Sequence, residues 1–173
     1  MIVNAVSVIL ASREHLKSIP GIELASAALF SERDLPANIR FRVTEPDDLL
    51  SAQQDERLWI AVNKKKRVVG FVAADLVDGE AYLQELGVLP EFGKKGIGTR
   101  LVAAVVGWAR DSGFSSLGLV TFKHLPWNAP FYAKLGFIVM DAPEYGPGFS
   151  KLFDDEKRLG INIENRVAMR LML

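Results

Sequence analysis

The chain has 173 residues, 49% of them apolar and 24% charged, which is enough for one substantial core and too few to favour two domains. Its 21 basic and 21 acidic side chains cancel, so no overall positive field would draw it to nucleic acid or to an anionic membrane surface. The absence of cysteine excludes disulfides, thiolate metal ligands and a cysteine nucleophile.

The beginning of the chain does not have the pattern of a signal peptide. Residues 1–16 are apolar but lack a basic leading segment and a small-residue cleavage site. No apolar run reaches the roughly 18 residues of a membrane span. We therefore expect a single cytoplasmic domain over residues 1–173.

The first half of the chain alternates apolar runs with polar turns. These runs predict a strand at 5–12, helices at 20–30 and 46–54, and three consecutive strands at 58–63, 67–77 and 81–89. The turn between the first two of these three strands reads NKKKR. Because no other basic residues surround it in sequence, we interpret it as a solvated hairpin turn and not as a nucleic-acid site.

The second half begins with a helix in which Leu101, Val105 and Trp108 recur at helical spacing, and Gly113 marks its end. The elements predicted after it are a strand at 115–122, a helix at 129–136, a strand at 137–140, a helix at 151–159 and a strand at 166–173. The order predicts one α/β domain, a mostly antiparallel meander followed by a strand, helix, strand unit.

The segment PEFGKKGIGTRLV, residues 90–102, contains Gly93, Gly96 and Gly98 immediately before a predicted helix. Glycine adopts positive φ and has no Cβ, so such a loop can turn several backbone N–H groups toward one point. The first N–H groups of the helix lack intrahelical partners, and the helix dipole adds partial positive charge. The segment therefore predicts a phosphate site, with a simple glycine turn as the alternative.

Two widespread phosphate loops do not fit this segment. A Walker loop requires Gly-Lys-Ser/Thr at its end, whereas Gly98 is followed by Thr99 and Arg100. A dinucleotide fingerprint requires Gly-x-Gly-x-x-Gly after the first strand of a parallel unit, whereas the spacing here is Gly-x-x-Gly-x-Gly after a meander.

The spacing instead resembles the acyl-CoA loop of the GNAT superfamily of N-acetyltransferases: Arg or Gln, two residues, Gly, one residue, then Gly or Ala. Gly96 and Gly98 occupy the glycine positions, and Gly93 stands where Arg or Gln is usual. This departure removes a side chain but leaves the backbone donors. The resemblance implies that acetyl-CoA is held here by Gly93, Lys94, Lys95, Gly96, Ile97, Gly98 and Thr99.

A second segment, NAPFYAKLGF at 128–137, resembles the later motif of the same family, in which a tyrosine on a short helix precedes Leu-Gly-Phe. Tyr132 matches that tyrosine in spacing. The family's frequent asparagine lies seven residues earlier, where this chain has Leu125, while Asn128 lies four before the tyrosine. Asn128 is therefore either a contact to acetyl-CoA or the N-cap of the helix.

Two motifs in the family's order imply a GNAT-like α/β fold: a mixed, mostly antiparallel central sheet flanked by helices, with the acyl-CoA pyrophosphate loop at a helix N-terminus. They also imply an acyltransferase that moves an acetyl group from acetyl-CoA, its co-substrate, to a primary amine of a small molecule or peptide by direct attack in a ternary complex. The alternatives are a non-catalytic CoA-binding regulatory module and a protein N-terminal or lysine acetyltransferase. A homodimer is compatible with the sequence.

The reaction needs a neutral amine, a polarised thioester carbonyl and a proton for the departing thiolate. The resemblance implies that two neighbouring strands splay, so that N–H groups of Leu86, Gly87 and Val88 hold the pantetheine and the carbonyl. Tyr132 is then the candidate general acid, with a packing role as its alternative. Glu85 is the candidate general base, direct or through water, with a solvent-facing position as its alternative.

Other polar and aromatic residues carry less information. His124 follows a predicted strand and is a second candidate base, whereas His15 is expected to be structural or on the surface. Trp127 and Phe131 either line an acceptor pocket or fill the core. Two separated histidines without clustered carboxylates predict no metal site.

Overall fold

The computed structural model describes residues 6–173, so Ala5, the first residue of the first predicted strand, lies outside the described residues. All strands of this part belong to one sheet, in the order β1-β2-β3-β4-β5-β7-β6. The strands are β1 (Ser7–Leu10), β2 (Leu58–Val62), β3 (Val68–Val77), β4 (Glu80–Val88), β5 (Ser116–Phe122), β6 (Ile138–Val139) and β7 (Arg166–Met172).

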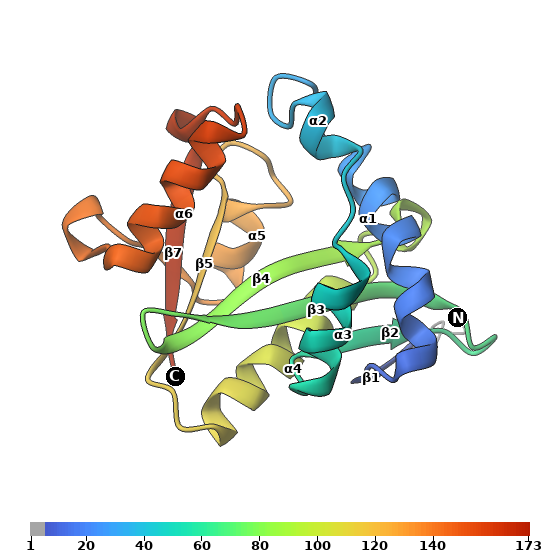
Figure 1. Cartoon of the computed structure of the whole chain (residues 1–173). Helices are drawn as coiled ribbons and strands as arrows, with labels where there is room; N and C mark the ends of the chain where they lie inside the picture. Colours follow the sequence, from blue (N-terminus) through green and yellow to red (C-terminus); the bar gives the residue numbers. More distant parts are fainter. Residues whose placement is uncertain (1–5) are drawn as a thin grey trace.

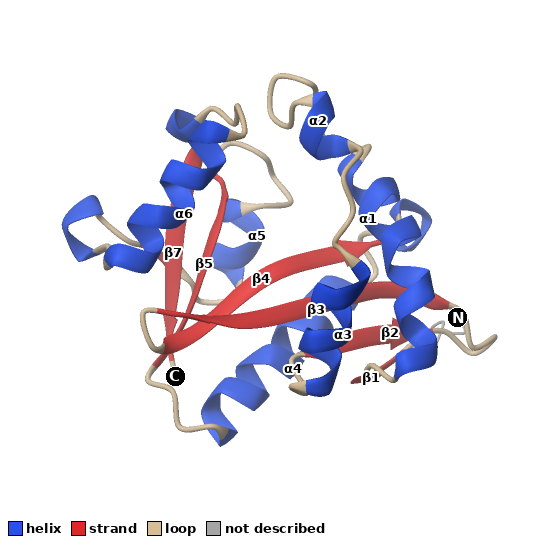
Figure 2. Ribbon diagram, in the orientation of Figure 1, coloured by secondary structure: helices blue, strands red, loops and turns tan. Residues whose placement is uncertain are grey.

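The helices lie between these strands in the chain. They are α1 (Ile19–Ala27), α2 (Ala37–Arg40), α3 (Pro46–Gln54), α4 (Ile97–Asp111), α5 (Ala129–Lys134) and α6 (Pro147–Arg158), with 3-10 turns at Arg13–Ser18, Pro90–Phe92, Ala142–Glu144 and Ile163–Asn165. Figure 2 shows α1 and α3 on one side of the sheet and α4 on the other. None of the helices between residues 6 and 173 combines the length and the hydrophobicity needed to cross a membrane.

The sheet has two parts that diverge from each other. Strands β1 to β4 form the predicted antiparallel meander, and β5 to β7 form an antiparallel second part. The two parts are joined by parallel pairing of β4 with β5 at only two positions, Ala81 with Leu117 and Tyr82 with Gly118. Beyond Tyr82 the strands separate, and Figure 1 shows β4 turning away from β5 toward α1. The splay that the resemblance implied is therefore present.

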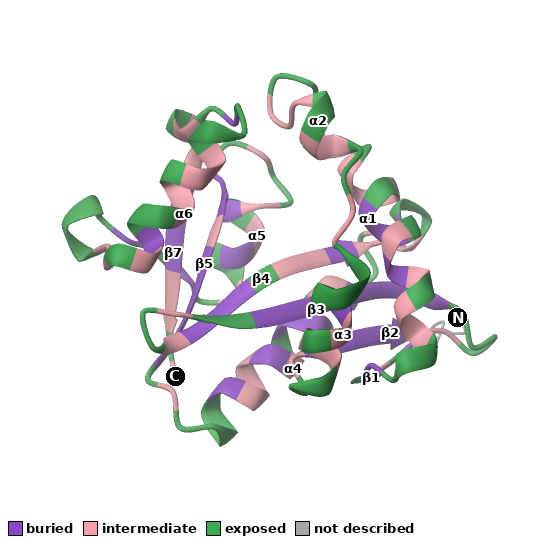
Figure 3. Ribbon diagram, in the orientation of Figure 1, coloured by how far each residue is buried: buried purple, intermediate pink, exposed green. Residues whose placement is uncertain are grey.

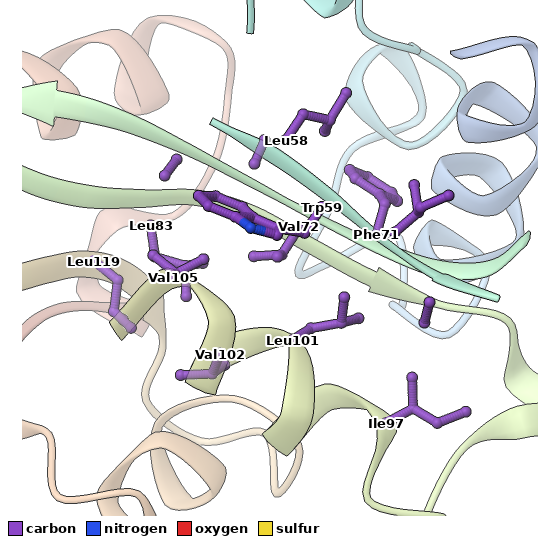
Figure 4. Packing of buried hydrophobic residues seen from close by; sticks show 14 of the residues in the cluster. Leu58, Trp59, Phe71, Val72, Leu83, Ile97, Leu101, Val102, Val105 and Leu119 are labelled. Carbon is purple, nitrogen blue, oxygen red and sulfur yellow. The ribbon is translucent and has the colours of Figure 1, made fainter. Parts of the chain in front are cut away.

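The core is packed mainly between the meander and α4. Leu101, Val102 and Val105 of α4 are buried against β2, β3 and β4, as Figure 4 shows. The helical periodicity in the sequence is confirmed, because these are the side chains that face the sheet. Figure 3 shows that β2, most of β3 and the first half of β4 are largely buried, whereas β4 becomes partly exposed after it leaves β5. The open end of β4 is thus partly accessible.

Some predicted boundaries are wrong for identifiable reasons. Helix α6 begins at Pro147 and not at residue 151, because Asp78 caps it: its Oδ1 accepts a hydrogen bond from the N–H of Gly148 at 2.7 Å. Helix α1 ends at Ala27 and not at residue 30, and the ring of Phe30 instead packs against that of Phe122, with centroids 5.5 Å apart. The short helix α2 was not predicted.

Candidate active site

A cavity of about 500 Å³ lies where β4 and β5 diverge. It is lined by side chains of α1 and of the segment 39–48 on one side, and by β5, α5 and Arg166 of β7 on the other. Glu85 of β4 and Tyr132 of α5, the two predicted catalytic residues, both line this cavity. Tertiary structure thus brings together two residues that are 47 positions apart in the sequence.

The backbone of β4 presents free polar groups to the gap. The N–H of Leu89 donates to the carbonyl of Val69, and pairs that exchange hydrogen bonds alternate along an antiparallel ladder. It follows that the backbone N–H groups of Glu85 and Gly87 donate hydrogen bonds to β3. The N–H groups of Leu86 and Val88 point away from β3, to the side where β5 no longer pairs. Two donors are therefore directed into the splay.

An extra residue in β4 determines where Glu85 points. Ala73 pairs with Glu85 and Ala74 pairs with Leu83, so Gln84 forms a β-bulge. Leu83 packs toward α4 (Figure 4), and without the bulge Glu85 would face the same way. The bulge instead turns Glu85 to the opposite face of the sheet, toward α1 and the cavity.

Glu85 lies beside a second carboxyl group in the cavity. Its Oε2 is 3.5 Å from the hydroxyl of Thr44, which donates a hydrogen bond to Glu23 of α1. Burial first, and then the negative charge of Glu23, raise the pKa of Glu85 to about 8. Glu85 is therefore only partly exposed, and its raised pKa makes it a stronger base than an ordinary glutamate.

Tyr132 is buried, and its ring packs edge-on against Phe131 and Phe137, with centroids 5.0 and 5.6 Å apart. Its hydroxyl has no hydrogen-bond partner among residues 6–173. Burial is the main factor that raises the pKa of Tyr132, so the phenol stays protonated at neutral pH. A protonated hydroxyl without a protein partner, directed at a cavity, is suited to donate to a bound molecule.

Asn128 occupies the N-cap position of α5, but its side chain makes no capping hydrogen bond. Its Oδ1 instead accepts a hydrogen bond of 2.6 Å from the hydroxyl of Thr121. Its Nδ2 is buried without a partner in the described part of the chain. Because an unpaired buried donor is costly, this amide group is a candidate contact for a ligand in the cavity that Asn128 lines.

The glycine loop leads into α4 as predicted. Lys94 and Gly96 both have positive φ, 57° and 74°, and Gly96 is the N-cap of the helix. The first backbone bond at the helix start joins the N–H of Arg100 to the carbonyl of Gly96, and no side chain caps the helix. The N–H groups of Ile97, Gly98 and Thr99 thus remain available for an anion.

The basic side chains of the loop are exposed. Lys95 folds back along the loop, where its Nζ donates to the carbonyl of Glu91 at 2.9 Å and lies 5.2 Å from the centroid of the Phe92 ring. Lys94 extends its charge into solvent near the start of α4. These two lysines add a screened positive charge to the fixed backbone donors.

The remaining candidates lie outside the cavity lining. His124 binds Asp34, with 2.8 Å between its Nε2 and Oδ1, and His15 is hydrogen-bonded to Ser12 through Nδ1 at 3.0 Å. Trp127 is exposed, and the ring of Phe131 packs near Gly98. Neither aromatic residue lines the cavity between β4 and β5.

Among the cavity residues that the sequence did not single out are Glu23, Thr44 and Arg166. Glu23 did carry a signal, because it is an acidic residue within the apolar run IELASAAL. Arg166 is paired with Glu156, with Nε 2.8 Å from Oε2, and its guanidinium lies 4.2 Å from the centroid of the Phe122 ring. Nothing in the local sequence of Thr44 or Arg166 indicates these contacts.

Comparison with known proteins gives a consistent result. Residues 27–137, more than half of the chain, match the Acetyltransferase (GNAT) family. An acetyltransferase of that family from Staphylococcus aureus has a similar structure, with a TM-score of 0.73 at 19% identity over 98% of this chain and 99% of the other.

Two further solved structures contain coenzyme A. PaiA N-acetyltransferase from Thermoplasma acidophilum, in complex with coenzyme A, gives a TM-score of 0.70 at 18% identity over 98% of this chain and 99% of the other. N-acetylglutamate synthase from Neisseria gonorrhoeae, with coenzyme A and N-acetyl-glutamate, gives 0.71 at 20% identity over 98% of this chain and 35% of the other. At these identities the likeness supports the fold.

Proposed function

The chain belongs to the GNAT family of acetyltransferases, and we propose that it moves an acetyl group from acetyl-CoA to a primary amine of a small molecule or peptide by direct attack in a ternary complex. The observation that carries this proposal is the cavity at the splay of β4 and β5, because it holds a basic carboxylate and a protonated phenol together. A binding module without turnover would need neither group.

Acetyl-CoA fits the free donors of the chain. Its pyrophosphate would accept hydrogen bonds from the N–H groups at the start of α4, from Gly96 to Thr99, with Gly93, Lys94 and Lys95 beside them. Its pantetheine and thioester carbonyl would lie along β4, where the N–H groups of Leu86 and Val88 face the gap. Asn128 would donate its unpaired amide to the same molecule.

The two titratable residues then have complementary roles. Glu85 takes the proton that the amine nitrogen sheds, directly or through water, as the nitrogen forms a bond to the carbonyl carbon. When the carbon–sulfur bond breaks, the Tyr132 hydroxyl gives its proton to the departing thiolate. Proton exchange with solvent returns both groups to their starting forms, so protons balance over one turnover.

The proposal is tested by the release of free thiol from acetyl-CoA in the presence of amines. The panel consists of alkyl and aryl primary amines, amino acids, and peptides with a free N-terminus or a single lysine. We expect thiol release that depends on one class of amine and yields the N-acetyl product by mass spectrometry. Turnover with peptides alone would identify a protein acetyltransferase, and acetyl-CoA binding without thiol release for any amine would refute the proposal.

The single domain, the cytoplasmic location and the homodimer remain predictions. The continuous sheet from β1 to β7 supports one domain over residues 1–173. A cytoplasmic location and a homodimer also stay predictions, to be checked by fractionation and by light scattering.

A further inference from the structure

Glu23 is an acidic residue of α1 that is only 5% exposed. It is held in place by one residue, since the backbone N–H of Thr44 lies 3.1 Å from both of its carboxylate oxygens and the Thr44 hydroxyl donates to its Oε1. A buried carboxylate is tolerated when hydrogen bonds replace its water. These bonds fix the Glu23 carboxylate at the inner wall of the cavity.

Glu85 is the neighbour of this carboxylate. Both carboxyl groups contact the same Thr44 hydroxyl, which lies 3.5 Å from Oε2 of Glu85. Two carboxylates in one site favour a state with a single shared proton, because their charges repel at short range. The cavity therefore contains a carboxyl pair, and Glu85, which is partly exposed, is its reachable member.

Other charged or titratable groups also line the cavity around Glu85. They are Arg42, Glu45, Asp48, Tyr132 and Arg166, from the segment 41–45, α3, α5 and β7. The strand on the other side, β3, places the uncharged Ala73 opposite Glu85. Burial, then the charge of Glu23 and the hydrogen bond to it, raise the pKa of Glu85, while the hydrogen bond from Thr44 lowers it. Burial is thus the first cause of the raised pKa of Glu85, and the charge of Glu23 is the second.

This basicity decides which form of an amine the site can use. An alkyl amine such as lysine has a pKa near 10.4, so proton transfer from its ammonium form to an ordinary glutamate is unfavourable by about 10⁶-fold. Transfer to a carboxylate with a pKa of about 8 is unfavourable by only about 10²-fold. Most primary amines are protonated at neutral pH, so the difference bears directly on turnover.

We propose that Glu23 is a positioning residue that makes Glu85 basic enough to take a proton from an acceptor that arrives as an ammonium ion. The inference rests on the proposed function and names its substrate class, protonated primary amines. One proton moves from the ammonium nitrogen to the ionised Glu85 carboxylate and on to solvent, and the nitrogen lone pair becomes free to attack. Glu85 then takes the second proton, which the nitrogen sheds as it bonds to the carbonyl carbon. The new carboxylic acid donates a hydrogen bond to the Glu23 carboxylate, which stabilises the product of the transfer. The unpaired Nδ2 of Asn128 belongs to a residue that lines the same cavity, as Tyr132 does, and it points to a ligand there.

The test compares the wild type with Glu23→Gln, which removes the charge and keeps the length of the side chain. Carbon-13 NMR of protein labelled at glutamate carboxyls follows Glu85 directly, with Glu85→Gln assigning its signal. We expect Glu85 to titrate near pH 8 in the wild type and at least about one pH unit lower in the variant. The acid limb of kcat/KM, measured with the best amine from the panel, should move by the same amount.

Two variants serve as controls. Glu45→Gln removes an exposed carboxylate that lines the same cavity, and it should leave both titrations in place. Glu23→Asp keeps the charge but moves it away by the length of one methylene group, so it should also lower the pKa of Glu85. This variant still tests the proposal if Glu23→Gln fails to fold.

Each outcome has a distinct meaning. An unchanged Glu85 titration in a folded Glu23 variant, or a shifted titration with an unshifted acid limb, overturns the role of Glu23 while leaving acetyl transfer intact. Loss of thiol release with every amine in the wild type overturns the proposed function, and with it the substrate class.

Discussion

A Cβ atom at Gly98 would lie 3.4 Å from Cζ of Phe131, an ordinary van der Waals distance. Position 98, in the first turn of α4, thus has room for a Cβ atom. A substitution there can test the anion site without disturbing the packing of α5.

Gly98→Asp should lower the affinity for CoA by at least about 10²-fold, because it places a negative charge beside the pyrophosphate. Gly98→Asn is the matched control, since asparagine has nearly the same shape without the charge. It should lower the affinity for CoA by a smaller factor. Calorimetry on folded proteins decides. Equal losses would indicate a steric cause, and undiminished affinity in both would remove the loop from the binding site.

Tyr132→Phe should lower kcat by about 10²-fold or more while leaving acetyl-CoA affinity unchanged. The ring contacts with Phe131 and Phe137 remain, and no described residue loses a hydrogen bond, so thermal stability should not fall. Rates must be measured where chemistry limits turnover. A kcat within about twofold of the wild type would make Tyr132 a packing residue, with another proton donor to be found.

Asn128→Asp should weaken acetyl-CoA binding by about tenfold or more. The carboxylate can still accept the hydrogen bond from Thr121, but an acceptor oxygen replaces the unpaired Nδ2 donor. Calorimetry measures the affinity, and circular dichroism verifies the fold. If the affinity is unchanged, Asn128 does not contact acetyl-CoA, and its unpaired buried amide only lowers the stability of the fold.

Glu85→Gln should stabilise the protein at high pH and not at low pH. In the folded state the pKa of Glu85 is raised from 4.5 to about 8, so the folded state binds this proton more tightly than the unfolded state. The stability contributed by the group is therefore lost progressively as pH rises from about 4.5 to about 8.

Urea unfolding of the wild type and Glu85→Gln at pH 5 and pH 8.5 measures this difference. We expect the variant to gain on the order of 1 kcal/mol or more at the higher pH. The exposed Glu45→Gln should show no such dependence. A gain that is equal at both pH values would argue against a raised pKa.

Gly87→Ala and Gly107→Ala should change stability in opposite directions. A Cβ at Gly87 would lie 2.7 Å from Cε1 of the fully buried Phe71, so the substitution should cost about 1–3 kcal/mol. A Cβ at Gly107, inside α4, would meet nothing within 4 Å, so alanine should add about 0.5–1 kcal/mol. Denaturant unfolding measures both. Similar effects at the two positions would contradict the close approach of β4 to Phe71.

Local features of the sequence were sufficient to predict most of the fold. The positive φ of Gly96 and the start of α4 follow from residue type and helix periodicity, which act over a few positions. The hairpin of β2 and β3 and the turn at Asp78 and Gly79 were predicted for the same reason. The prediction that the loop is a phosphate site therefore rests on local sequence and needs no tertiary contact.

The reactive part of the site was decided by tertiary structure. Glu85 was named from its place on a strand, but the bulge at Gln84 determines which face it occupies, and the register with β3 fixes that bulge. The pairing of Glu85 with Glu23 joins β4 to α1, and the bond from Thr121 to Asn128 joins β5 to the start of α5. A pKa depends on burial and on charges nearby in space, and those distances are set by packing between segments that are far apart in the sequence.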